Sequence, residues 1–202
     1  KVSVGARKDF NNLFADNFIW KFSVRQEFGE GFYARGSGGT SYNNPRAQEA
    51  GLFANTRNNP TIKSQHVKTY AAGAGVNGEV LDGTFNAEVG YFTTDITNLF
   101  GSAAIRDVCP GVDPTRVINP DIITPVEFCR TFQSYGLTGL STAYFNTKAQ
   151  QNITGYTFDF SVDLKQIQAD FSFTKQESLE PNPVYGLTAV RAGTGAALTK
   201  VV

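Results

Sequence analysis

The 202-residue sequence contains no methionine, a single histidine, a single tryptophan and only two cysteines. One histidine excludes a multi-histidine metal site within this chain. The 18 lysine and arginine side chains balance the 18 aspartate and glutamate side chains, so the chain lacks the positive charge that nucleic-acid binding requires. We therefore expect neither a metal centre nor a nucleic-acid partner.

Long apolar runs and long stretches of helical period are also missing. No run of about 18 apolar residues is present, which excludes a transmembrane helix. A strand of a membrane barrel needs only about 10 alternating residues, so this absence does not exclude a membrane protein. The chain is instead rich in glycine, with 20 residues, and in phenylalanine, with 17. This composition is typical of an all-β protein.

The clearest strand signal is the segment YTFDFSVDLKQIQADFSFTK, residues 156–175. Apolar and polar side chains alternate along it, which is the period-2 pattern of a β-strand, and the pattern changes phase only around 165–166. We therefore predict a hairpin in which Leu164 pairs with Ile167, Phe160 with Phe171 and Phe158 with Phe173. A slip of one residue would place each phenylalanine opposite a polar residue, so the pattern selects this register.

Similar alternation predicts further strands that begin near Lys1, Asn17, Gly31, His66 and Gly83. Seven strands result, and an eighth is expected near the C-terminal AALTKVV. Short links follow the second, fourth and sixth strands, at 29–31, 77–82 and 165–166, whereas long links follow the third and fifth, at 41–62 and 100–142. An up-and-down topology would place the short turns at one rim and the long loops at the other, as in bacterial outer-membrane barrels.

The alternation divides the side chains of the strands into two rows with different chemistry. One row is apolar and contains Phe18, Trp20, Phe22, Phe85, Val89, Phe158, Phe160, Phe171 and Phe173. The other row is polar and contains Lys21, Arg25, Arg35, Glu88, Asp159, Asp163 and Asp170. In an outer-membrane barrel the first row would face lipid and the second a watery lumen with its ligands, whereas in a soluble sandwich the first row would face a protein core.

Two signals for chemistry have simpler interpretations. Asp159, Asp163 and Asp170 on one face would suit acid–base chemistry or a cation site, but no partner motif for catalysis is visible, and we favour a hydrated lumen wall. The segment GAGVNG, residues 73–78, matches G-x-G-x-x-G but ends a strand instead of opening a helix. We therefore expect no catalytic site and no bound cofactor.

Three segments carry a resemblance to a known family: FYARGSGGTSYNNP at 32–45, NPTIKSQHVKTYAAGAGVNGEVLDGTFNAEVGYFTTDITNLF at 59–100 and NTKAQQNITGYTFDF at 146–160. They resemble the C-terminal part of TonB-dependent outer-membrane receptors. The matching positions are Asn59, Pro60, Ile62, Lys63, Tyr70, Gly73, Tyr91, Phe92, Asp95, Ile96, Asn98, Leu99, Asn146 and Gly155. The chain departs from the family pattern at Ser64 and Gln65, which replace Pro-Glu, and at Ala71, which replaces a glutamate.

The resemblance implies an architecture. Residues 1–202 would be an antiparallel, up-and-down segment of seven or eight strands from a transmembrane barrel of about 22 strands, without the plug domain and the remaining strands. The chain also starts inside a strand, at Lys1, with neither an initiating methionine nor a signal peptide. We therefore expect it to be a piece of a longer protein.

The resemblance also implies a function in the bacterial outer membrane. Such a receptor binds a scarce solute, for example a ferric siderophore, cobalamin or an oligosaccharide, and imports it with energy from the TonB–ExbB–ExbD system, which acts through the plug. The chain would then be no enzyme, and its partners would be outer-membrane lipid, a small solute and a partner protein at the cell surface. Two alternatives stay open: a complete eight-stranded barrel for adhesion or anchoring, and a soluble β-sandwich that binds carbohydrate.

The two cysteines lie in the longest predicted loop. Cys109 and Cys129 are separated by a stretch with several prolines, and the periplasm through which such a receptor is exported is oxidising. Zinc is the rival interpretation, but two thiols without a nearby histidine make a poor zinc site. We predict a disulfide between Cys109 and Cys129.

Overall fold

The computed structural model describes residues 1–12, 14–46, 62–104, 109, 122–123, 142–147, 150–164, 167–181 and 188–199. The regular elements within these ranges are all strands: β1 (Val2–Asp9), β2 (Asn17–Gly29), β3 (Phe32–Asn43), β4 (Gln65–Val80), β5 (Gly83–Thr97), β6 (Phe100–Ala104), β7 (Ile122–Ile123), β8 (Thr142–Thr147), β9 (Gln151–Leu164), β10 (Ile167–Pro181) and β11 (Thr188–Thr199). Among the described residues, no helix has the length and apolar character needed to cross a membrane.

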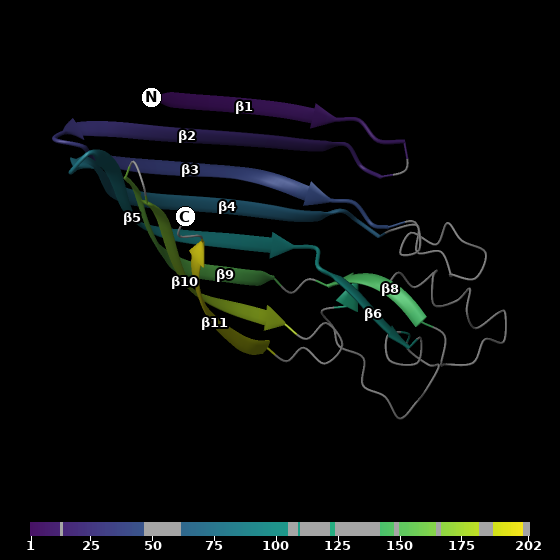
Figure 1. Ribbon diagram of the computed structural model, residues 1–202. Helices are drawn as coiled ribbons and strands as arrows, with labels where there is room; N and C mark the ends of the chain where they lie inside the picture. The colour runs from purple at the N-terminus through teal and green to yellow at the C-terminus, as the bar shows by residue number, and fades with distance from the viewer. Residues whose placement is uncertain are drawn as a thin grey trace.

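Eight of the strands form one antiparallel sheet in the order β1-β2-β3-β4-β5-β9-β10-β11, which we call the wall. Figure 1 shows it as a single curved layer. Strands β1 and β11 stand at the two ends of the order, so the sheet is open in the described part of the chain. The predicted all-β, antiparallel, up-and-down arrangement is confirmed. A closed barrel of eight strands is not what these residues form.

The register of the β9–β10 hairpin is the one that the sequence predicts. Leu164 pairs with Ile167, Phe160 with Phe171 and Phe158 with Phe173. Because residues that pair across neighbouring strands project from the same face, the register keeps the phenylalanines together and apart from the aspartates.

The three short turns lie at one end of the wall, between β2 and β3, β4 and β5, and β9 and β10. The turn after β2 depends on glycine, because Gly31 has a positive φ of 81° and a Cβ there would collide with the carbonyl oxygen of Asn77. In return, the Gly31 carbonyl accepts a hydrogen bond from the Asn77 amide at 2.9 Å. The described ends of the long links, at 44–46, 62–64 and 98–99, lie at the opposite end, as expected.

Two details of the strand prediction are wrong. The segment 100–142, predicted as one loop, contains β6 and β7 and the start of β8, and these three strands form a second sheet in the order β6-β8-β7. Strands of two to six residues are too short to show a clear alternation, so the sequence gives no signal for them. The last strand also begins earlier than predicted, at Thr188.

The wall has little core of its own. Phe18 is 61% exposed, Val89 is 56% exposed, and Phe158 and Phe160 are each 37% exposed. The soluble sandwich would require a second layer of protein over these side chains, and the described residues supply none. Within the described residues, the strongest burial of a large apolar side chain is at Phe145 of β8, which is 0% exposed.

Candidate functional site

The two predicted rows of side chains occupy opposite faces of the wall. Phe22 pairs with Gly38, Gly38 with Tyr70, and Tyr70 with Thr93, so these residues share a face. Val89 shares that face, because it lies four residues before Thr93 in β5, and it pairs with Phe158. We call this side the aromatic face; it carries Phe18, Trp20, Phe22, Phe85, Val89, Phe158, Phe160, Phe171 and Phe173. The polar face is the other side; it carries Lys21, Arg25, Arg35, Glu88, Asp159, Asp163 and Asp170. The assignment of these faces to lipid and lumen stays a prediction.

A network of polar contacts surrounds Glu88 of β5, which is only 8% exposed. Arg35 Nε of β3 donates a hydrogen bond of 2.6 Å to Glu88 Oε1, and the Arg35 guanidinium also forms an ion pair with that oxygen. The hydroxyl of Tyr33 donates a hydrogen bond of 2.8 Å to Glu88 Oε2. Both carboxylate oxygens are therefore satisfied, which is the condition for keeping a charged group in a buried position.

Tyr33 reaches Glu88 across the intervening strand because Gly75 of β4 lies between them in register. A Cβ at Gly75 would stand 2.5 Å from both Cζ and the hydroxyl oxygen of Tyr33. The missing side chain therefore makes room for the ring. On its other side, the ring of Tyr33 lies 3.7 Å from the Arg25 guanidinium carbon, in a cation–π contact.

Asn86 extends this network toward the short turns. Its Nδ2 donates a hydrogen bond of 3.1 Å to the Tyr33 hydroxyl, and it also bonds Oδ1 of Asn77. Sequence reasoning brought out Arg25, Arg35 and Glu88 but missed Tyr33 and Asn86. The available signal was position, because Tyr33 lies two residues before Arg35 and so shares its face.

The polar face carries charges of both signs, in different proportions on its two halves. β1 to β3 form a mainly basic half with Arg7, Lys21, Arg25 and Arg35, although Asp9 and Glu27 share this half and form ion pairs with Arg7 and Arg25. β4, β5, β9 and β10 form an acidic half, with the carboxylates of Glu79, Glu88, Asp159, Asp163 and Asp170. The contact between Arg35 and Glu88 joins the two halves, whereas Asp159 accepts a hydrogen bond of 2.6 Å from the Ser172 hydroxyl.

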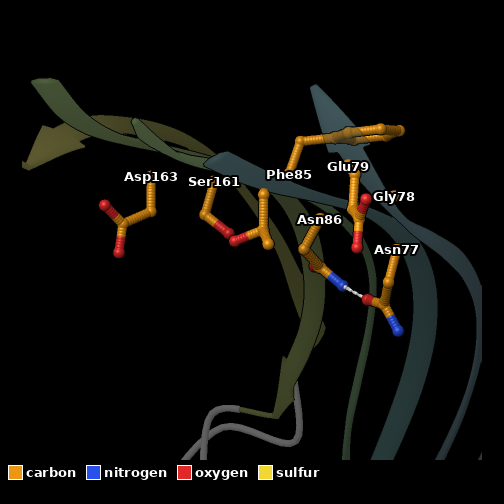
Figure 2. Close-up of a pocket in the computed structure, with 8 residues that line it drawn as sticks. Asn77, Gly78, Glu79, Phe85, Asn86, Ser161 and Asp163 are labelled. Carbon is orange, nitrogen blue, oxygen red and sulfur yellow. Dashed lines mark hydrogen bonds between the residues drawn. The ribbon is translucent and has the colours of Figure 1, made fainter. Parts of the chain in front are cut away.

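A shallow pocket of about 450 Å³ opens on the acidic half, near the short turns. Its lining is Asn77, Gly78, Glu79, Thr84, Phe85, Asn86, Ser161 and Asp163. Figure 2 shows Asp163 and Ser161 projecting to the same side as the bonded Asn86–Asn77 pair, while the Phe85 ring lies on the other side of the strands. Apolar atoms make up most of the exposed lining, and Glu79, Ser161 and Asp163 add oxygen atoms that could contact a cationic or hydroxyl-rich group. The described residues contain no cluster of three or more metal-ligating side chains.

The basic half has a second groove, of about 440 Å³, around Lys21. In register Lys21 stands between Gly5 and Gly39, so no side chain covers it from either neighbouring strand. Hydroxyl groups on this face line the groove, from Ser3, Ser23, Ser37, Ser41 and Thr69. The ion pairs found among the described residues involve Arg7, Lys8, Arg25 and Arg35, and Lys21 takes part in none of them. The groove therefore suits an anionic group that also accepts and donates hydrogen bonds.

The predicted disulfide stays a prediction. Cys109 is buried, at 1% exposed, whereas Cys129 lies outside the described residues.

Comparison with known proteins agrees with this geometry. The family model of the TonB dependent receptor-like beta-barrel matches residues 1–198. Among solved structures, the chain is similar to a double mutant of the hemophore receptor HasR of Serratia marcescens, in complex with its hemophore HasA and heme, with a TM-score of 0.55 and 14% sequence identity. The match covers 90% of this chain and 30% of the HasR chain, and at this identity it shows the fold alone. No curated protein matches the sequence significantly. The chain belongs to the TonB-dependent receptor β-barrel family.

Proposed function

We propose that the chain forms part of the barrel of a bacterial outer-membrane receptor that imports a scarce solute with energy from the TonB–ExbB–ExbD system. The observation that carries this proposal is the family match over residues 1–198 on a single-layered wall with one aromatic and one polar face. A membrane barrel satisfies its backbone within the sheet and turns its apolar side chains to lipid. The paired interior strands of the wall and its exposed aromatic face support this proposal. The receptor is a transporter and not an enzyme.

We further propose that residues 1–202 are only part of the protein. The wall is open at β1 and β11, and the chain spans about 30% of the length of the HasR chain that it matches. The unpaired edges of β1 and β11 would then join the remaining strands of the barrel, and a plug domain would supply the contact with TonB.

The polar face supports a lumen that contacts a charged or hydroxyl-rich solute. Lys21, Arg25 and Arg35 provide cations on one half. The other half provides the carboxylates of Glu88, Asp159, Asp163 and Asp170. This distribution supports a ferric siderophore, cobalamin or an oligosaccharide as the solute. The HasR structure contains a protein ligand, the hemophore HasA, and we propose that the present receptor likewise contacts a partner protein at the cell surface.

Growth tests distinguish transport from the alternatives. A deletion strain should lose uptake of one solute among radiolabelled ferric siderophores, cobalamin and oligosaccharides, and the complete gene should restore it. Deletion of tonB should abolish the restored uptake, because the proposed import needs the energy that TonB transmits. Uptake that continues without TonB, or a defect confined to adhesion, would refute the proposal and favour the small adhesion barrel.

The Lys21 groove provides a residue-level test of solute contact. Lys21→Ala in the complete receptor should raise the Kd of an anionic solute about tenfold, because a hydrogen bond to a charged group contributes about 1.5 to 3 kcal/mol. Lys175→Ala is the matched control, since Lys175 pairs with Tyr156 on the aromatic face. Equal effects of the two substitutions in calorimetric titration would contradict a specific role for Lys21.

A further inference from the structure

The most completely buried part of the described chain lies where the long links leave the wall. Phe145 and Thr147 of β8 are each 0% exposed, Asn146 between them is 2% exposed, and Ser64 is 5% exposed. We call residues 44, 62–64, 98–99 and 145–147 the loop root. In Figure 1, β8 lies beyond the right-hand ends of β5 and β9, at the end of the wall opposite the short turns.

The side chain of Asn146 is the centre of the loop root. Its Oδ1 accepts a hydrogen bond of 2.7 Å from the Lys63 amide. Its Nδ2 donates to the Lys63 carbonyl oxygen at 3.0 Å and to the Asn98 carbonyl oxygen at 2.9 Å. Both amide hydrogens and the amide oxygen of Asn146 are therefore hydrogen-bonded. The side chain bonds both the N–H and the C=O of Lys63, as the backbone of a neighbouring strand would.

Further hydrogen bonds join the other segments of the loop root. Asn98 Nδ2 donates to the Ser64 carbonyl oxygen at 3.2 Å, and the Ser64 hydroxyl donates to Asn44 Oδ1 at 2.7 Å. The Thr147 amide donates to the Leu99 carbonyl oxygen at 3.0 Å. Asn98 has a positive φ of 56°, a conformation that asparagine tolerates better than most residues.

These contacts connect four places that are far apart in the sequence. Asn44 follows β3, residues 62–64 precede β4, residues 98–99 follow β5, and Asn146 lies 83 residues from Lys63 and 48 from Asn98. They are the start and end of the link between β3 and β4 and the start of the link that leads from β5 toward β9. Lys63 and Asn98 come from one segment of the sequence resemblance and Asn146 from another, and the structure brings the three residues into one contact.

We propose that Asn146 is a positioning residue that holds the roots of these two links in a single arrangement and thereby sets the geometry of the rim that the solute meets. The statement about the solute rests on the proposed function. Removal of the Asn146 amide would break three hydrogen bonds, to the Lys63 amide and to the carbonyl oxygens of Lys63 and Asn98, in a partly buried place, which is costly. The two roots would then separate more often, and the rim would lose its fixed geometry.

The test compares Asn146→Asp with Asn146→Ala in the complete receptor, by hydrogen exchange at the Lys63 and Thr147 amides. Both variants should exchange about tenfold or more faster than the wild type at pH 8. Aspartate keeps the acceptor but loses both donors, and its ionised carboxylate would face the carbonyl oxygens of Lys63 and Asn98. Burial and these oxygens favour the protonated form, whose hydroxyl donates to one carbonyl.

The pH dependence of amide exchange distinguishes a positioning role of Asn146 from a role in which its side chain only fills space. Protection in Asn146→Asp, corrected for the intrinsic exchange rate, should be present at low pH and be lost as pH rises through the carboxyl pKa, whereas Asn146→Ala should stay unprotected at every pH. If Asn146 merely fills space, the aspartate variant, which has nearly the same shape, would match the wild type throughout. That result would overturn the proposal. Asn152→Asp is the control, because Asn152 bonds Asp95 on the wall and should leave Lys63 protected.

Solute binding completes the test. Asn146→Ala should raise the solute Kd about tenfold while the thermal unfolding of the wall stays unchanged. Faster exchange with an unchanged Kd would overturn the positioning role. If the wild-type receptor binds no solute, the proposed function fails, and the exchange comparison alone decides whether Asn146 fixes the loop root.

Discussion

The wall and the loop root differ in where their apolar side chains go. On the wall, Phe18 is 61% exposed and Val89 is 56% exposed, although both lie in regular strands. At the loop root, Phe145 is 0% exposed. A protein in water rarely leaves a row of large apolar side chains uncovered, so the wall is built for contact with another medium or partner, whereas the loop root packs against its own chain.

The two regions also differ in how the backbone is satisfied. Within the wall each interior strand has a neighbour on both sides, and the ladders use the peptide groups. The ladders stop where β4 begins and where β5 ends, and there the side chains of Asn98 and Asn146 bond the backbone instead. Polar side chains therefore bond the backbone at the loop root, whereas the network around Glu88 on the wall joins side chains to one another.

The largest expected effect is the loss of packing at the loop root. Phe145→Ala should cost about 3 to 5 kcal/mol of local stability, because truncation of a fully buried phenylalanine leaves a cavity. Phe18→Ala should cost clearly less, since that ring is exposed in the described chain. Hydrogen exchange of the β8 amides measures the first effect. Similar losses for both variants would remove the distinction between the two regions.

A charge on the aromatic face should produce the next largest effect. Phe160→Arg should lower the free energy of unfolding by about 2 to 4 kcal/mol if residue 160 lies near the middle of the bilayer, because the guanidinium would face hydrocarbon. Ser161→Arg is the matched control, since Ser161 lies on the polar face beside the acidic pocket. Denaturant unfolding of the complete receptor in lipid vesicles measures both. Tolerance of arginine at 160 would contradict the assignment of this face to lipid.

The sequence predicts the wall far better than it predicts the loop root. Alternation over ten or more residues sets the strands, and the phenylalanines of the β9–β10 hairpin set its register, because a slip would change every side chain to the other face. The short strands β6 to β8 leave no such pattern. The partners of Asn146 lie 48 and 83 residues away, and no local signal in a sequence encodes contacts of that range.

The sequence likewise predicts one part of the candidate site and not the other. Lys21, Arg25, Arg35 and Glu88 could be placed on one face from alternation alone. The bond from Tyr33 to Glu88 could not, because it depends on the pairing of β3 with β4 and of β4 with β5, which brings Gly75 between them.

The predicted disulfide would add a covalent restraint to the region that follows β6. Cys129→Ser should lower local stability by about 3 kcal/mol in the chain-entropy model for a loop of about 20 residues. Cys129 is the better position to change, because Cys109 is buried and a serine there would add a desolvation cost. Mass spectrometry of the non-reduced receptor checks the bond. Two titratable thiols in the folded, non-reduced protein would show that the bond does not form.

The smallest expected effect concerns Gly75, whose lack of a side chain leaves room for Tyr33 to bond Glu88. A Cβ at Gly75 would stand 2.5 Å from the Tyr33 ring and 2.7 Å from the Ala87 carbonyl oxygen. Gly75→Ala should therefore displace Tyr33 from Glu88 and cost about 1 to 3 kcal/mol.

Gly5 offers a matched control on the same face, because a Cβ there would stand 3.4 and 3.5 Å from the flexible side chain of Lys21, an ordinary contact. Gly5→Ala should be neutral or stabilise by about 0.4 to 1 kcal/mol, through the reduced entropy of the unfolded chain. A double-mutant cycle with Tyr33→Ala separates the ring from the backbone: if the ring is the obstacle, most of the cost of Gly75→Ala disappears in the Tyr33→Ala background. A cost that persists would place the obstacle at the Ala87 carbonyl, and the wall would then exclude side chains at Gly75 through its strand spacing instead of through its polar network.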